Sequence, residues 1–220
     1  MKKSSVASNT SWANLAYNHG FGNHVESEAE KGALPIGRNN PQKCPMGLYA
    51  EQLSGTPFTY QKHRNQRSWL YRIMPTCKHG AWVDRTADFP YWISDFQCSK
   101  GLKVTPEQLR WAPQKFSDSL FHQSIKTMAG AGSPDLKQGL TISHYSFAKS
   151  MTQRRIAMYN SDGDMLIVPQ VGTLQVTTEF GKLRVEPKEV LIVPRGVKFS
   201  MDIEQGNGRG WIAELFKGHL

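Results

Sequence analysis

Hydrophobic and polar residues alternate in short runs along the second half of the chain. Between Thr173 and Phe180, Leu174, Val176 and Thr178 alternate with polar side chains, which is the period of a half-buried strand. Asp-Gly and single glycines divide such runs. Runs that predict strands cover residues 140–147, 155–159, 165–170, 173–180, 183–185, 190–193, 199–203 and 211–216. Short strands at this spacing are typical of an antiparallel β-sandwich or barrel.

The first half of the chain has weaker patterns. Residues 17–47 are rich in glycine, asparagine and proline, which predicts an irregular N-terminal arm. Residues 67–74 place Trp69, Tyr71 and Ile73 on one side and predict a strand with an aromatic face.

Two segments in the middle of the chain carry local signals. Thr105-Pro106-Glu107-Gln108 has the residues that begin a helix, and the proline at 113 limits that helix to one or two turns. Residues 128–134 contain two glycines and a proline and predict a loop.

The composition fits one folded domain. The chain has 220 residues, of which 39% are hydrophobic and 10% aromatic, enough for one core. We predict a disordered tail over residues 1–16 and a mainly β domain with one or two short helices over residues 17–220. Met165–Val168, the longest apolar run, is far shorter than the ~20 residues of a membrane-spanning helix. We therefore predict no membrane segment.

The cysteines indicate where in the cell the protein is located, and the net charge bears on its partners. Cys44, Cys77 and Cys98 form no C-x-x-C pair, which favours a reduced, intracellular location. The net charge of +9 raises the possibility of a nucleic-acid partner, and the densest basic cluster is at residues 62–67. No nucleic-acid reader motif accompanies it, and a solvated strand edge has the same pattern, so we predict no nucleic-acid partner.

Side chains able to carry catalysis show no established spacing. The seven histidines include no H-x-H or H-E-x-x-H motif, and no serine lies in a G-x-S-x-G context. Asp162 and Asp164 flank a glycine, as solvated acids of a turn do. His122, His144 and a carboxylate could meet in space, but a hydrogen-bonded structural histidine is the commoner case for His144. We predict no catalytic, cofactor-binding or metal-ligating residue.

A series of segments resembles the homogentisate 1,2-dioxygenase family, in order and along nearly the whole chain from about residue 17. They are Gly20–Asn23, Leu34-Pro35, Asn39–Gln42, Leu48–Gly55, Arg67–Ile73, Gln108–Trp111, Gly130–Gly132, Tyr159–Asp164, Leu166–Gln170, Thr178–Lys182 and Val185–Pro187. Leu-Tyr-Ala-Glu-Gln-Leu-Ser-Gly followed closely by Arg-Ser-Trp-Leu-Tyr-Arg is specific to the family.

The resemblance implies a cupin-like protein with two unequal halves, of which this chain is the N-terminal one. The family cleaves the ring of homogentisate with O2 at Fe(II), giving maleylacetoacetate in tyrosine and phenylalanine catabolism. Two histidines and a carboxylate hold its iron in the C-terminal half, so no iron ligand is carried over to this chain. A cytoplasmic homo-oligomer, trimeric or hexameric, is expected.

The positions at which a cupin holds a metal can be located by spacing. Gly172 closes the first cupin motif, which places Met165 at the glutamate position and Met158 and Asn160 near the histidine positions. Pro194-x-Gly196 begins the second motif and places Phe199 at its histidine position. None of these four residues is a good ligand for ferrous iron. We expect core side chains where the metal would be and no catalysis by this chain alone.

An alternative function remains open from the sequence. The chain could be a non-enzymatic cupin-like module that binds a small molecule or assembles with a partner, with a self-contained core and no exposed apolar patch at the C-terminal end.

Overall fold

The computed structural model describes residues 11–15, 31–35, 44–55, 59–61, 64, 67–93, 95–96, 106–108 and 110–220. The chain divides into two compact units. The first comprises Met1–Val83 with Glu179–Gly181, and the second comprises Asp84–Thr178 with Lys182–Leu220. The predicted tail lies outside the described residues except for 11–15, and its boundary at residue 16 stays a prediction.

The described part of the first unit contains a two-stranded antiparallel sheet. The two strands are β1 (Tyr49–Gly55) and β2 (Arg67–Arg72), and the unit also contains the 3-10 helices η1 (Trp12–Asn14) and η2 (Pro45–Gly47). The strand predicted over residues 67–74 is therefore confirmed up to Arg72. Leu70 is buried and Trp69 is exposed, so the aromatic side of this strand is not its buried side.

An ion pair and two hydrogen bonds hold the end of this hairpin. Arg72 pairs with Glu51, which also accepts hydrogen bonds from the side chain and the backbone N–H of Thr76. The hydrogen bonds from Thr76 and Arg72 lower the pKa of Glu51 to about 2.

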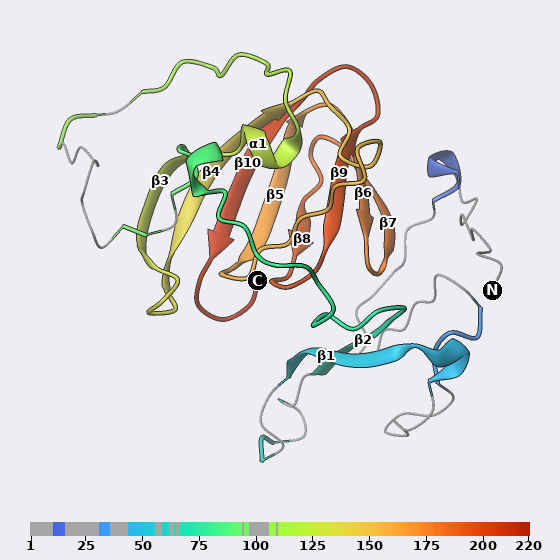
Figure 1. Cartoon of the computed structure of the whole chain (residues 1–220). Coiled ribbons are helices and arrows are strands. Elements are labelled where there is room, and N and C mark those ends of the chain that lie inside the picture. The colour runs from blue at the N-terminus through green and yellow to red at the C-terminus, as the bar shows by residue number, and fades with distance from the viewer. Residues whose placement is uncertain are drawn as a thin grey trace. The chain divides into compact units, whose positions relative to one another are not determined.

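The second unit is an antiparallel β-sandwich (Figure 1). One sheet has the strand order β3-β4-β10-β5-β8 and the other β7-β6-β9. The elements are η4 (Thr86–Asp88), α1 (Phe121–Ser124), β3 (Lys126–Ser133), β4 (Gln138–Phe147), β5 (Asp164–Val171), β6 (Leu174–Thr178), β7 (Gly181–Val185), β8 (Leu191–Val193), β9 (Phe199–Ile203) and β10 (Gly208–Leu215). The predicted mainly β, cupin-like antiparallel sandwich is confirmed.

Aromatic side chains fill the centre of this sandwich. Phe121, from the short helix α1, contacts the rings of Tyr145, Phe147 and Phe199 edge-on, with centroid distances of 5.2, 5.5 and 6.2 Å. All four side chains are almost fully buried. Edge-to-face contacts of this kind stabilise a core beyond the apolar area that they bury.

Most of the predicted strands are present, and the exception has a local cause. Residues 155–159 are not a strand, because residues 151–155 turn and Arg155 has a left-handed φ of 54°. Only Met158 pairs there, with Phe199.

Two predictions for the middle of the chain are wrong. The loop expected at 128–134 is largely strand β3, because its glycines allow close strand pairing. A Cβ on Gly132, which has φ 85°, would lie 2.1 Å from the carbonyl oxygen of Gln138. The helix expected after residue 105 is also absent from the residues described there, 106–108 and 110–113.

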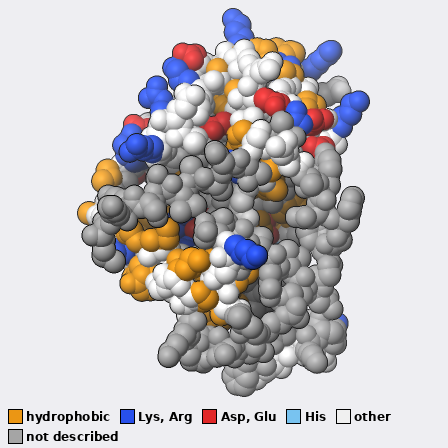
Figure 2. All heavy atoms as spheres, turned by 90° about the vertical axis from the view of Figure 1, so that its right-hand side faces the viewer, with side chains coloured by type: hydrophobic (Ala, Val, Ile, Leu, Met, Phe, Trp, Pro, Cys, Tyr) orange, Lys and Arg blue, Asp and Glu red, His pale blue; other side chains and the backbone are white. Residues whose placement is uncertain are grey.

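The surface of the described residues carries charges of both signs. On the face seen in Figure 2, lysine and arginine side chains are interspersed with aspartate and glutamate. Most of the basic cluster at residues 62–67 lies outside what the structure describes. In the described part of the chain, no helix is long and apolar enough to cross a membrane.

Replacing Phe121 tests the aromatic core. Phe121→Ala removes a fully buried ring and three ring contacts, and we expect it to lower the free energy of unfolding by about 3–5 kcal/mol. Leu136→Ala, in the exposed turn between β3 and β4, is the control and should change it by less than about 0.5 kcal/mol. Urea denaturation measures both. Equal effects would contradict the packing described here.

Candidate functional site

Of the four positions that correspond to a cupin metal site, Met165 and Phe199 are buried and Met158 and Asn160 are half-buried. Met158 and Phe199 exchange two backbone hydrogen bonds of 2.9 and 2.8 Å, so these two motif positions are neighbours in the structure. The side chains of Met165 and Phe199 are each 1% exposed and belong to the core. Asn160 donates a hydrogen bond to Glu214. These positions are therefore occupied by packing and hydrogen-bonding groups.

These side chains do not fit ferrous iron. Fe(II) in oxygenases is held by imidazole and carboxylate groups, whereas a benzene ring has no donor atom and a thioether is a soft ligand. In the part of the chain that the structure describes, no group of three His, Cys, Asp or Glu side chains could hold a metal ion. The possible site made of His122, His144 and a carboxylate does not form there.

Both histidines occupy packed environments instead. His122, on α1, lies 5.8 Å from the ring of Phe89, and burial lowers its pKa. His144, on β4, is buried edge-on against Trp211 at 5.3 Å. Burial, followed by the nearby charges of Arg209 and Lys126, lowers the pKa of His144. Both rings therefore favour the neutral form.

The second unit contains a cleft of about 380 Å³ at one end of the five-stranded sheet. Its lining combines two aromatic rings, two acids and three other polar side chains: Arg85, Thr86, Phe89, Trp92, Asn160, Asp162 and Glu214. The segment around η4 supplies the aromatic wall, and the turn before β5 and the strand β10 supply the carboxyl groups.

Glu214 is the most buried polar group of this cleft. It lies on the inner side of β10, in register with Met165 and Thr141 of the two neighbouring strands. Asn160 donates to its Oε1 at 2.6 Å and Thr141 to its Oε2 at 3.3 Å. Burial raises the pKa of Glu214, an effect that outweighs these hydrogen bonds. A carboxyl that keeps its proton to higher pH can donate a hydrogen bond to a ligand.

The turn before β5 closes against this strand. The side-chain oxygen of Asn160 accepts the backbone N–H groups of Asp162 and Gly163 at 2.9 and 3.3 Å, as in an Asx turn. A Cβ at position 163 would lie 2.7 Å from the carbonyl oxygen of Leu215, so only glycine fits. The turn predicted at Asp162-Gly163 is confirmed.

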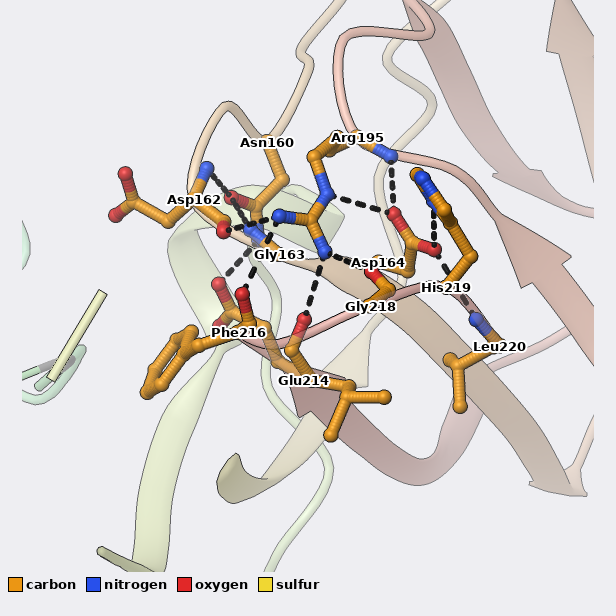
Figure 3. Close-up of polar contacts among 11 residues, drawn as sticks. Asn160, Asp162, Gly163, Asp164, Arg195, Glu214, Phe216, Gly218, His219 and Leu220 are labelled. Atoms are coloured by element: carbon orange, nitrogen blue, oxygen red, sulfur yellow. Dashed lines mark hydrogen bonds and ion pairs between the residues drawn. The ribbon is translucent and has the colours of Figure 1, made fainter. Parts of the chain in front are cut away.

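A second buried carboxylate lies next to this turn, on the opposite side of the sheet. Asp164 is 1% exposed and accepts hydrogen bonds from the backbone N–H and the Nε of Arg195, at 2.9 and 3.0 Å (Figure 3). The remaining nitrogens of Arg195 donate to backbone carbonyls of residues 162, 215, 216 and 218. His219 Nδ1 lies 3.1 Å from the same carboxylate.

Arg195 therefore joins three segments that are distant in the sequence: the start of β5, the Pro-Arg-Gly turn and the stretch after β10. Burial alone would raise the pKa of Asp164, but the hydrogen bonds from Arg195 and Leu220 and the charge of Arg195 lower it. We call this group, Asp164 with Arg195, the Arg195 clamp.

Comparison with known proteins identifies the family. A family model described as the N-terminal part of homogentisate 1,2-dioxygenase matches residues 16–220. The chain belongs to the homogentisate 1,2-dioxygenase family. The resemblance noted in the sequence is thereby confirmed.

Relatives named homogentisate 1,2-dioxygenase are similar over most of this chain. Those of Emericella nidulans and Arabidopsis thaliana are each 44% identical, over 92% and 94% of this chain. That of Dictyostelium discoideum is 47% identical over 93%. The matches cover only 44% to 46% of these dioxygenases, so the chain spans less than half their length.

Some solved structures have a distant likeness to this chain. An RmlC-like cupin of Methanocaldococcus jannaschii has a TM-score of 0.37 and 11% identity, and covers 51% of this chain and 93% of its own. A cupin superfamily protein of Desulfitobacterium hafniense has a TM-score of 0.36 and 21% identity, and covers 50% of this chain and 94% of its own.

The two buried carboxyl groups, Glu214 and Asp164, are not predicted from the sequence. Glu214 lies in phase with Ile212 and Phe216, so an acid on the buried side of a strand could have been read from the alternation. Asp164 was assigned as a solvated turn residue, which is wrong because it is buried by its bonds to Arg195. Nothing in the local sequence points to that partner, which lies 31 residues away.

Asp164→Asn tests the Arg195 clamp. The substitution leaves the guanidinium of Arg195 without its buried counter-charge. We therefore expect a loss of about 3 kcal/mol in the free energy of unfolding at neutral pH. The pKa of Asp164 is lowered, so the wild-type advantage should disappear as the pH falls from about 4. Asp118→Asn is the control, since Asp118 pairs with Lys149 while 80% exposed. Similar losses in the two variants, measured by urea denaturation, would contradict the clamp.

Glu214→Gln should have the opposite pH behaviour. The amide keeps partners for Asn160 and Thr141 but cannot ionise. Because the pKa of Glu214 is raised in the folded state, the free energy of unfolding of the wild type falls as the pH rises from about 4.3, the unfolded pKa of a glutamate, through the folded pKa. We expect the variant to lack this fall, so its stability relative to wild type should increase between pH 4 and pH 8. Parallel curves of unfolding free energy against pH would refute the assignment.

Proposed function

We propose that this chain is the N-terminal portion of an enzyme that opens the ring of homogentisate with O2 at Fe(II), giving maleylacetoacetate in tyrosine and phenylalanine catabolism. The match of residues 16–220 to the N-terminal model of homogentisate 1,2-dioxygenase is the observation that carries this proposal. The iron ligands, two histidines and a carboxylate, belong in this proposal to the other half of the enzyme.

The role proposed for this half is to form a rigid scaffold. Its sandwich is closed by the aromatic cluster around Phe121, and the metal positions of a cupin are taken by buried Met165 and Phe199. The Arg195 clamp joins the end of β10, the strand that carries Glu214, to the start of β5. We accordingly propose that the chain alone does not catalyse ring cleavage.

A second candidate is a non-enzymatic module that binds a small molecule. The cleft beside Glu214 supports this candidate, because it places a carboxyl of raised pKa beside the rings of Phe89 and Trp92. Retention of a small polar aromatic compound by the chain without any turnover would favour it.

We also propose that the enzyme is a cytoplasmic homo-oligomer that binds neither nucleic acid nor membrane. Free thiols at Cys44 and Cys77 support a reducing compartment. Cys98 lies outside the described residues.

Oxygen consumption tests the proposed activity. The chain would be compared with a chimera in which it is followed by the part of the Dictyostelium discoideum relative that lies beyond the match. Both proteins would be loaded anaerobically with Fe(II), desalted and supplied with homogentisate and O2. We expect homogentisate-dependent uptake by the chimera and none by the chain alone, because the chain's cupin metal positions do not fit iron.

Two results would count against the proposal. Ring cleavage by the chain alone would show that its residues hold the iron. A folded chimera that binds iron but does not consume O2 with homogentisate would contradict the assigned activity. The full-length Dictyostelium discoideum protein serves as the positive control.

A further inference from the structure

The outer face of the five-stranded sheet is apolar across its whole width. Residues paired in register on antiparallel strands point to the same side of a sheet. The central outer row runs Ala129, Ile142, Ala213, Leu166 and Ile192, one residue from each strand. This row contains no polar side chain and is about 19 Å wide at ordinary strand spacing.

The neighbouring rows extend this surface. The first neighbouring row, on one side of the central row, contains His144, Trp211 and Val168. The second, on the other side, contains Ala131, Leu140 and Leu215. Lys126 ends the first row and Asp164, held in the Arg195 clamp, ends the second. Charges are thus confined to the ends, and the middle is hydrophobic. We call these three rows the outer face.

Several of its side chains are accessible in the 220-residue chain. Leu140 is 42% exposed, Ile192 45% and Trp211 37%, whereas the inward residues of the same strands, such as Ile167 and Ile212, are 0% and 2% exposed. An antiparallel sheet with one face in water normally alternates apolar and polar residues, and β5 does not: Met165-Leu166-Ile167-Val168 is apolar throughout. Such a strand indicates a sheet that is covered on both faces.

We infer that the outer face is the docking surface for the C-terminal half of a homogentisate dioxygenase. This inference rests on the proposed function. The relatives that match this chain have more than half of their length beyond the match. That half is tethered to the sheet in each relative, so it reaches the outer face at a high effective concentration. An apolar patch with a central tryptophan and a polar rim has the composition of such an interface.

Side-chain footprinting of the chain and the chimera tests this inference. Hydroxyl radicals label exposed Trp, Leu and Ile side chains, and mass spectrometry locates the label. We expect Trp211, Leu140 and Ile192 to be labelled in the isolated chain and protected in the chimera. Leu136, exposed in the β3–β4 turn, is the internal reference and should be labelled in both.

A charge placed on the outer face provides a matched variant. Ile192→Lys should leave the melting temperature of the isolated chain unchanged, because the side chain is 45% exposed there. In the chimera it should abolish the protection of Trp211 and Leu140. Leu136→Lys is the control and should preserve that protection.

Each remaining outcome decides the matter. Labelling of the outer face that is equal in chain and chimera would overturn the inference, even if the chimera were active. Protection in the isolated chain that grows with concentration would assign the face to a second copy and overturn it too. A chimera that fails to fold would show that the face does not fit the relative's C-terminal half. Protection in a chimera without homogentisate-dependent O2 uptake would uphold the surface and contradict only the proposed function.

Discussion

The hydrogen-bonded ion pair between Asp164 and Arg195 joins the start of β5 to the end of β10 and to the Pro-Arg-Gly turn. A carboxylate that is 1% exposed is stable there only because a guanidinium and two backbone N–H groups satisfy it. The same guanidinium donates hydrogen bonds to backbone carbonyls at the end of β10 and just after it, and so fixes that strand against β5. The turn at Gly163 and the residue Glu214 lie directly beside this junction, because Gly163 precedes Asp164 and Glu214 precedes Leu215, which is paired with Asp164.

Two buried carboxyls on adjacent register positions meet opposite environments. Asp164 is paired with a cation and keeps its charge, whereas Glu214, on the inner side of the sheet, has only neutral hydrogen-bond donors and a raised pKa. The rest of the buried core is mainly aromatic, aliphatic and thioether side chains, including Met165 and Phe199 at the positions of a cupin metal site. This half of the family fold thus uses its interior for packing, which is consistent with the iron being held elsewhere in the proposed enzyme.

The strands were predictable where alternation is strong. Leu174 and Val176 predict β6 correctly because burial of one side imposes period two, whereas β5 is predicted by a short, continuous apolar run that follows Asp162-Gly163. The prediction of a loop at β3 is wrong because Gly132 lies in a strand and lets it approach the backbone of Gln138 closely. This contact is seen in the structure and cannot be read from the local sequence. Met158 and Phe199, which the spacing of the cupin motifs assigns to two metal positions, are hydrogen-bonded neighbours in the structure. The sequence does not predict the clamp or the cleft, because the clamp pairs residues 31 positions apart and the cleft brings the segment of residues 85–92 together with Asn160, Asp162 and Glu214.

The central claim is that this chain is a scaffold whose cupin metal positions are packed with core side chains. Equilibrium dialysis of the 220-residue chain against Fe(II) under anaerobic conditions tests it most directly. The account predicts that iron retained after desalting stays far below stoichiometric, and that Met165→Leu, which removes the buried sulfur, does not change it. Stoichiometric iron that remains bound after desalting would contradict the account.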